Sequence, residues 1–154
     1  MLDQFRDTSL RGTIDMLSMM MGMEGSISET ALPPEEIYVS GIVSFRSSTV
    51  SGLVSLRFAR DTAVALVSMM LGMEADEVDD ETMFDGVGEM TNIVCGQLKV
   101  DFSRELESLD ISIPSIIHGK GHRINVFHGA ESGEYAVACD SGTIALRIEM
   151  CSDK

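Results

Sequence analysis

The sequence predicts an α+β fold: a mostly antiparallel sheet with three helices packed against it. Three segments carry apolar residues at helical spacing, whereas six others are rich in β-branched residues and end at turn residues. The strand runs follow one another without the repeated β–α–β alternation that a parallel sheet requires. At 154 residues, the chain forms one domain, 1–154, long enough to bury about 70% of its unfolded surface.

The first predicted helix covers residues 9–21. Its apolar side chains recur at helical spacing, at Leu10, Ile14, Leu17 and Met21. Thr8 or Ser9 is suited to cap its start, and Gly22 is suited to the left-handed residue at its end. Residues 24–36 lose this periodicity and contain two consecutive prolines, which predicts a connecting loop.

A hairpin is predicted next, with strands over 37–45 and 50–58. Both runs are rich in β-branched and aromatic residues, and a polar tetrapeptide separates them. Gly41 and Gly52 occupy matching places in the two runs. Strand glycines mark either bulges or close packing, and we favour close packing here.

The second predicted helix starts at Asp61, as its cap, and ends at Gly72. Its inward-facing side chains are Val64, Leu66, Val67, Met70 and Leu71. Its last residues, 67–74, match 17–24 at six of eight positions. So short a match fits either an internal duplication or two helices that end alike.

The longest predicted helix covers residues 81–106, with Asp79 or Asp80 as its cap. At about 100° per residue, its core side carries Met83, Val87, Met90, Val94 and Leu98. The opposite side carries a narrow line of residues, hereafter the polar stripe: Asp85, Glu89, Asn92, Gly96 and Lys99.

Three glycines, Gly86, Gly88 and Gly96, are predicted beside or on the polar stripe. Each disfavours an exposed helix by roughly 1 kcal/mol relative to alanine. Because these glycines have no side chains, the backbone of another protein could approach the helix closely. Asn92 is also a poor residue for the middle of a helix. The alternative is an ordinary solvated helix face.

The C-terminal third predicts antiparallel strands joined by tight turns. The expected strands cover 111–118, 123–128, 134–139 and 142–150.

The composition excludes several classes of protein. A formal charge of −14 repels phosphate backbones, so we expect no nucleic-acid partner. No apolar run approaches the ~18 residues of a membrane span, so we expect a soluble cytoplasmic protein. Cys95, Cys139 and Cys151 cannot all pair and form no C-x-x-C motif, which is typical of reduced thiols.

Metal chemistry has weak support in the sequence. His118, His122, His128 and Cys139 could be assembled into a metal site, but their spacing fits no helix face. The twelve methionines could be copper(I) ligands, although methionine at helical spacing is usually adaptable core. We therefore predict no metal site, and no Ser/His/Asp arrangement is recognisable.

The amide of Asn92 in the polar stripe is suited to positioning a reactant and not to acid–base chemistry. Asparagine does not ionise near neutral pH, but it can hold a water molecule through its C=O and N–H groups. Glu89 can pair with a cation or act as a base. An amide aimed at a phosphoryl group is similar to the water-positioning glutamine of nucleotide hydrolases, yet the sequence has no phosphate-cradling loop.

On these residues the chain resembles the CheX members of the CheC/CheX/FliY phosphatases of bacterial chemotaxis. The family signature has Asp or Ser, then Glu four residues on and Asn three further, here Asp85, Glu89 and Asn92. Supporting matches are the Met-Gly-Met-Glu helix end, the Val-Ser-Gly-Ile-Val strand, Leu71-Gly72, and residues 113–122. The resemblance covers about residues 10–150 and implies the pseudo-symmetric CheC/CheX fold.

The resemblance implies that the protein dephosphorylates a CheY-like response regulator. Glu89 would pair with a lysine at the phosphorylation site, Asn92 would orient the attacking water, and Asp85 would support the contact. From the polar stripe itself, we predict that Gly88, Gly96 and Lys99 belong to the binding surface. The protein would have no cofactor of its own, since the regulator would bring magnesium.

CheC-like relatives carry two such motifs, whereas no asparagine precedes residue 92 here. The CheX type, whose members resemble homodimers joined through their sheets, is therefore favoured. The alternative from another class is a non-catalytic adaptor that binds or sequesters the regulator.

Overall fold

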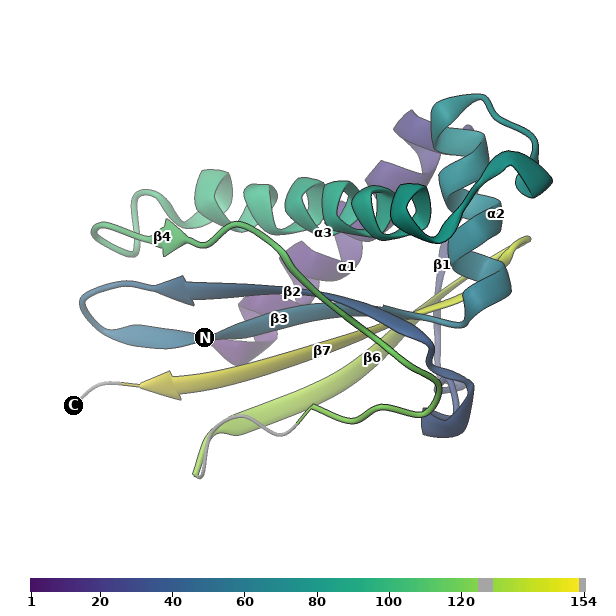
Figure 1. Ribbon diagram of the computed structural model, residues 1–154. Coiled ribbons are helices and arrows are strands. Elements are labelled where there is room, and N and C mark those ends of the chain that lie inside the picture. Colours follow the sequence, from purple (N-terminus) through teal and green to yellow (C-terminus); the bar gives the residue numbers. More distant parts are fainter. Residues whose placement is uncertain (125–128, 153–154) are drawn as a thin grey trace.

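The computed structural model describes residues 1–124 and 129–152. Three helices cover one face of a single antiparallel sheet (Figure 1), which confirms the α+β prediction. The helices are α1 (Leu2–Met21), α2 (Arg60–Leu71) and α3 (Asp80–Phe102). The strands are β1 (Ser26–Ser28), β2 (Val39–Arg46), β3 (Val50–Phe58), β4 (Asp110–Ile111), β5 (Ser115–His118), β6 (Glu131–Cys139) and β7 (Gly142–Ser152). Short 3₁₀ turns occur at Pro34–Glu36 and Ala75–Glu77.

The sheet has an internal pseudo-symmetry. Its order is β1-β6-β7-β3-β2-β4, and β5 also pairs with β2. The chain passes through α1, β1, β2 and β3, and later repeats this order as α3, β5, β6 and β7. β3 and β7 pair at the centre, whereas β1 and β5 each pair with the hairpin of the other half. The pseudo-symmetric arrangement that the resemblance implies is therefore present.

Several predicted helix ends are confirmed. Gly22 and Gly72 end α1 and α2 in the left-handed conformation, with φ of 62° and 66°. Asp79 caps α3, because its side chain accepts a hydrogen bond from the backbone N–H of Thr82. Such a bond satisfies one of the amides that a helix start leaves without a partner.

The predicted starts of α1 and α2 are wrong. Helix α1 begins at Leu2, so Thr8 and Ser9 lie inside it, where both are buried and neither caps it. The capping position of α2 is Ala59, and Asp61 lies within the first helical turn. An acidic residue there still favours the positive end of the helix.

Several further bounds differ from the predictions. The loop expected at 24–36 contains β1 and a 3₁₀ turn. Helix α3 ends at Phe102 and not near 106. The strand expected over 111–118 is divided into β4 and β5 by residues 112–114. Of the strand expected over 123–128, Arg123 and Ile124 are not in a strand, and 125–128 lie outside the described residues.

The core lies between the helices and the sheet. At one end, Phe5 of α1 packs against Phe45 of β2 and Phe102 of α3, with ring centroids 4.8 and 4.6 Å apart. The hairpin glycines are packing sites, as favoured. A Cβ on Gly41 would lie 2.0 Å from Thr91 Oγ1, and one on Gly52 would lie 2.0 Å from a backbone oxygen of β7. The β2–β3 register is continuous, so neither glycine is a bulge.

None of the helices within residues 1–124 and 129–152 is both long enough and apolar enough to cross a membrane.

Candidate functional site

Helix α3 lies over β2, and this packing determines which of its sides faces outward (Figure 1). Thr91 is fully buried on its inner side, where its hydroxyl donates to the carbonyl of Val87 at 2.7 Å. Because Gly41 has no side chain, Thr91 can approach the sheet closely. The predicted core residues are all buried: Met83, Val87, Met90, Val94 and Leu98.

All residues of the polar stripe are exposed, as predicted: Asp85, Glu89, Asn92, Gly96 and Lys99. At about 1.5 Å per residue, the stripe extends roughly 21 Å along the helix. Glu89 and Asn92 are adjacent on this face because residues three apart in a helix are neighbours. Their position leaves the carboxylate and the amide accessible to another protein.

The stripe is acidic except at its far end. No Lys or Arg lies between Arg60 and Lys99 in the sequence. Among the described residues, no ion pair engages Asp85 or Glu89. Both carboxylates are therefore available to a cation from another molecule.

The three glycines of α3 have different surroundings. Gly96 is exposed, and a Cβ there would have no atom within 4 Å. Gly88 is half-buried, and a Cβ would lie 3.7 Å from Ile116 Cδ1, an ordinary contact. Gly86 does not belong to the open face: it is buried, and a Cβ would lie 2.5 Å from a methyl group of Val67 in α2. It is a glycine because the two helices pack closely there.

Strand β5 and the two residues before it border the polar stripe, a neighbour that the sequence did not predict. His118 stacks on Phe84 of α3 with ring centroids 4.4 Å apart. Pro114 lies beside the Gly88 position, and the neighbouring Ile113 is 86% exposed. These residues lie beside α3 because β5 pairs with β2. The spacing of residues within a segment does not predict which strands pair.

The histidines considered as metal ligands have other contacts. His118 stacks on Phe84, and both ring nitrogens of His122 are within 2.7 Å of hydrogen-bond partners, Ser40 Oγ and the Gly119 carbonyl. His128 lies outside the described residues. In the part of the chain that the structure describes, no three His, Cys, Asp or Glu residues are grouped to hold a metal ion.

A known protein family matches a long segment of the chain. The model of the family described as "Chemotaxis phosphatase CheX" matches residues 39–137, which include β2, α3 and most of β6. The chain belongs to the CheX family.

Relatives of known identity include other CheX proteins. The CheY-P phosphatase CheX of Thermotoga maritima is 27% identical over 107 residues, which cover 69% of this chain and 66% of that protein, about two thirds of its length. The crystal structure of CheX from Vibrio vulnificus has a TM-score of 0.83 at 24% identity and covers 96% of this chain and 97% of that one.

A third relative was solved as an assembly. The CheX–CheY–BeF₃–Mg²⁺ complex from Borrelia burgdorferi matches with a TM-score of 0.72 at 22% identity, covering 95% of this chain and 97% of that one. These likenesses establish that the CheX fold is shared along nearly the whole chain.

Proposed function

We propose that this protein is a phosphatase that hydrolyses the aspartyl phosphate of a CheY-like response regulator and so ends the regulator's signal. The observation that carries the proposal is the exposed pair Glu89 and Asn92 on the open face of α3, in a chain of the CheX family. The T. maritima relative is named a CheY-P phosphatase.

The side chains of the stripe are suited to positioning. Glu89 pairs with a lysine at the regulator's phosphorylation site, which docks the two proteins. The Asn92 amide enters that site and holds a water molecule, accepting a hydrogen bond through its C=O or donating one through its N–H. Placing the nucleophile in line with the phosphorus is the main task in phosphoryl transfer.

The reaction then balances without a covalent intermediate on this protein. The water oxygen forms a bond to phosphorus as the bond between phosphorus and the aspartyl oxygen breaks. The products are the regulator's free carboxylate and inorganic phosphate, which takes the water oxygen and releases a proton to solvent. Magnesium bound by the regulator neutralises the phosphoryl oxygens, and the B. burgdorferi complex contains Mg²⁺ together with CheY.

The rest of the stripe forms the binding surface in this proposal. Asp85 lies one helical turn before Glu89 and supports the contact with the regulator's cation. Gly88 and Gly96 leave room for the regulator's backbone, and Lys99 contacts it at the far end of the stripe. The proposed site therefore has carboxylates that attract the regulator's cation at one end, and glycines that leave space for its backbone along the helix.

We also propose that the protein acts as a homodimer in the cytoplasm, with two copies joined through their sheets. The resemblance to the CheX type supports this assembly.

The decay of radiolabelled phosphorylated regulator tests the proposal. Wild-type protein should accelerate the decay, and Asn92→Ala should abolish the acceleration, by about 100-fold or more, while largely preserving binding. Glu89→Ala should weaken binding, whereas the exposed Glu105→Ala provides a control for loss of a carboxylate elsewhere.

Two outcomes would contradict the proposal. If Asn92→Ala accelerates decay as well as the wild type, the amide does not position the water. If the wild-type protein binds the regulator without hastening phosphate loss, the protein is the non-catalytic adaptor.

A further inference from the structure

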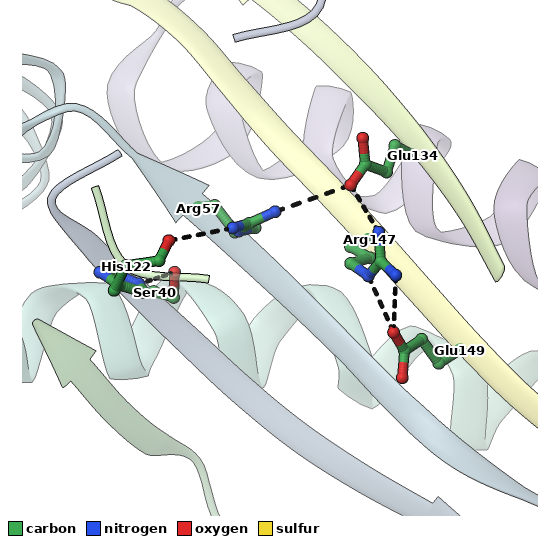
Figure 2. Close-up of polar contacts among 6 residues, drawn as sticks. All are labelled: Ser40, Arg57, His122, Glu134, Arg147 and Glu149. Atoms are coloured by element: carbon green, nitrogen blue, oxygen red, sulfur yellow. Dashed lines mark hydrogen bonds and ion pairs between the residues drawn. The ribbon is translucent and has the colours of Figure 1, made fainter. Parts of the chain in front are cut away.

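Three arginines gather on the sheet face away from the helices, although the protein carries a formal charge of −14. A small cleft of about 100 Å³ is lined by Pro34, Arg57, Arg123, Ile124, Glu134 and Arg147. Figure 2 shows the polar part of this face, with the helices behind the strands. Three guanidinium groups so close together repel one another, so each is expected to have an anionic or hydrogen-bonding partner nearby.

The Arg57 guanidinium is buried with poorly satisfied donors. The residue is 7% exposed, and its Nε has no hydrogen-bond partner among the described residues. Its Nη1 lies 3.9 Å from Glu134 Oε1, beyond hydrogen-bond distance. Its Nη2 donates a long hydrogen bond, of 3.5 Å, to the His122 carbonyl (Figure 2). Buried donors in native proteins normally have acceptors, so an acceptor is needed here.

Arg147, in contrast, is well paired. Its Nη1 donates to Glu134 at 2.5 Å, and its Nε donates to Glu149 at 2.9 Å. Glu134 therefore lies closer to Arg147 and forms only a long ion pair, of 3.9 Å, with Arg57. Arg123 is exposed and forms no ion pair within residues 1–124 and 129–152.

The charges of this group leave a positive excess. Arg57, Arg123 and Arg147 contribute +3, and Glu134 and Glu149 contribute −2, so the sum is +1. Glu149 also has a buried oxygen without a partner, but it does not line the cleft. The excess is therefore located at the end of the cleft where Arg57 and Arg123 lie.

The electrostatic surroundings of Arg57 agree with this account. Burial lowers the pKa of its guanidinium, and the charges of Arg147 and Arg123 lower it further, against the opposing effect of Glu134. An anion between the arginines would compensate the cost of burying this charge.

A hydrogen-bonded anchor holds the wall that carries Arg123. The Nδ1–H of His122 donates to the Gly119 carbonyl at 2.7 Å, so its Nε2 accepts from the buried Ser40 hydroxyl at 2.7 Å (Figure 2). This anchor fixes the segment before Arg123 against β2, and Arg123 and Arg57 line the same cleft.

We propose that the cleft between Arg57 and Arg123 is a binding site for a small oxyanion, a phosphate or carboxylate group. The planar fork of a guanidinium matches such oxygens in geometry and charge, and the unpartnered Nε of Arg57 supplies a buried donor. The site lies on the opposite face of the sheet from the polar stripe and does not depend on the proposed phosphatase activity.

Titration of the isolated protein with inorganic phosphate, followed by NMR at constant ionic strength, tests this site. The Arg57 Nε–H signal should shift and saturate as phosphate is added, and chloride should not reproduce the shift. A parallel titration with acetate distinguishes a site for carboxylate groups from one that requires phosphate. If neither anion moves the Arg57 signal, or if chloride moves it equally, the proposal is overturned.

Arg123→Gln is the decisive variant because Arg123 is exposed and its loss does not disturb the core. Loss of one charge-assisted contact should weaken the binding of the anion by about tenfold. Arg104→Gln removes an exposed arginine outside the cleft and should leave the binding unchanged. Equal affinity in Arg123→Gln and wild type would refute the assigned site, whatever the phosphatase assay shows.

Discussion

Replacing Gly96 by alanine should make the protein more stable and less able to act on its partner. Gly96 lies inside α3, is exposed, and has no atom within 4 Å of the position of a Cβ. The added methyl group therefore meets no steric resistance within the protein. It lies, however, on the surface that we assign to the regulator.

The magnitude follows from helix propensity. Glycine disfavours an exposed helix interior by roughly 1 kcal/mol relative to alanine, so Gly96→Ala should raise the free energy of unfolding by about 0.5–1 kcal/mol. For a chain of this length the midpoint of thermal unfolding should rise by about 2–4 °C per kcal/mol. If the regulator's backbone approaches Gly96, the methyl group should cost on the order of 1–3 kcal/mol in binding, roughly a 5- to 150-fold increase in KM.

Gly72→Ala is a matched control for the stability measurement. A Cβ on Gly72 also has no atom within 4 Å, but its φ of 66° is unfavourable for alanine. That substitution should therefore destabilise the protein by about 1 kcal/mol. The two variants add the same methyl group without a clash. Opposite changes in their free energies of unfolding would therefore be due to the difference in backbone conformation.

Urea unfolding and the rate of regulator dephosphorylation measure the two effects separately. An unchanged KM for Gly96→Ala would show that no partner backbone comes near this position, and the argument from bare helix glycines would fail. A destabilised Gly96→Ala would refute the stability argument independently of any activity.

Two further predictions concern the interior. Gly41→Ala should destabilise the protein by about 1–3 kcal/mol, because the new Cβ would lie 2.0 Å from Thr91 Oγ1. Adding Thr91→Ala should recover part of this loss, as measured by urea unfolding. A wild-type unfolding midpoint for Gly41→Ala would contradict the close packing of Gly41 against Thr91. Burial raises the pKa of the Cys95 thiol to about 12, so at pH 8 a thiol reagent should label the half-buried Cys139 and Cys151 well before Cys95. Equal labelling rates in the folded protein would show that Cys95 is accessible.

The orientation of α3 could be predicted from the sequence because it depends on local periodicity. A 3.6-residue repeat places Val87 and Asn92 on opposite sides wherever the helix packs, and the structure has one buried and the other exposed. Local end signals were also informative: Asp79 was one of the two predicted caps of α3, and Gly72 was the predicted end of α2. The family recognised from the Glu89–Asn92 motif is confirmed by the match to the CheX family.

Features that depend on tertiary contacts were not accessible in the same way. The first turns of α1 are helical because Phe5 packs between Phe45 and Phe102, residues distant in the sequence. Gly86 and Gly96 are alike in sequence terms, yet only Gly86 faces α2. The short strand β1 was not predicted, because only its pairing with β6 makes residues 26–28 a strand.

The exchange of β1 and β5 between the two halves has a consequence for folding. A fragment that contained only the first half would keep its hairpin but lose the strand that completes that hairpin's outer edge, and the second half would have the same defect. Local unfolding of either half therefore removes contacts from the other, which favours cooperative, all-or-none melting. The helix that presents Asn92 remains rigid as long as both halves are intact, even though a single half supplies that residue.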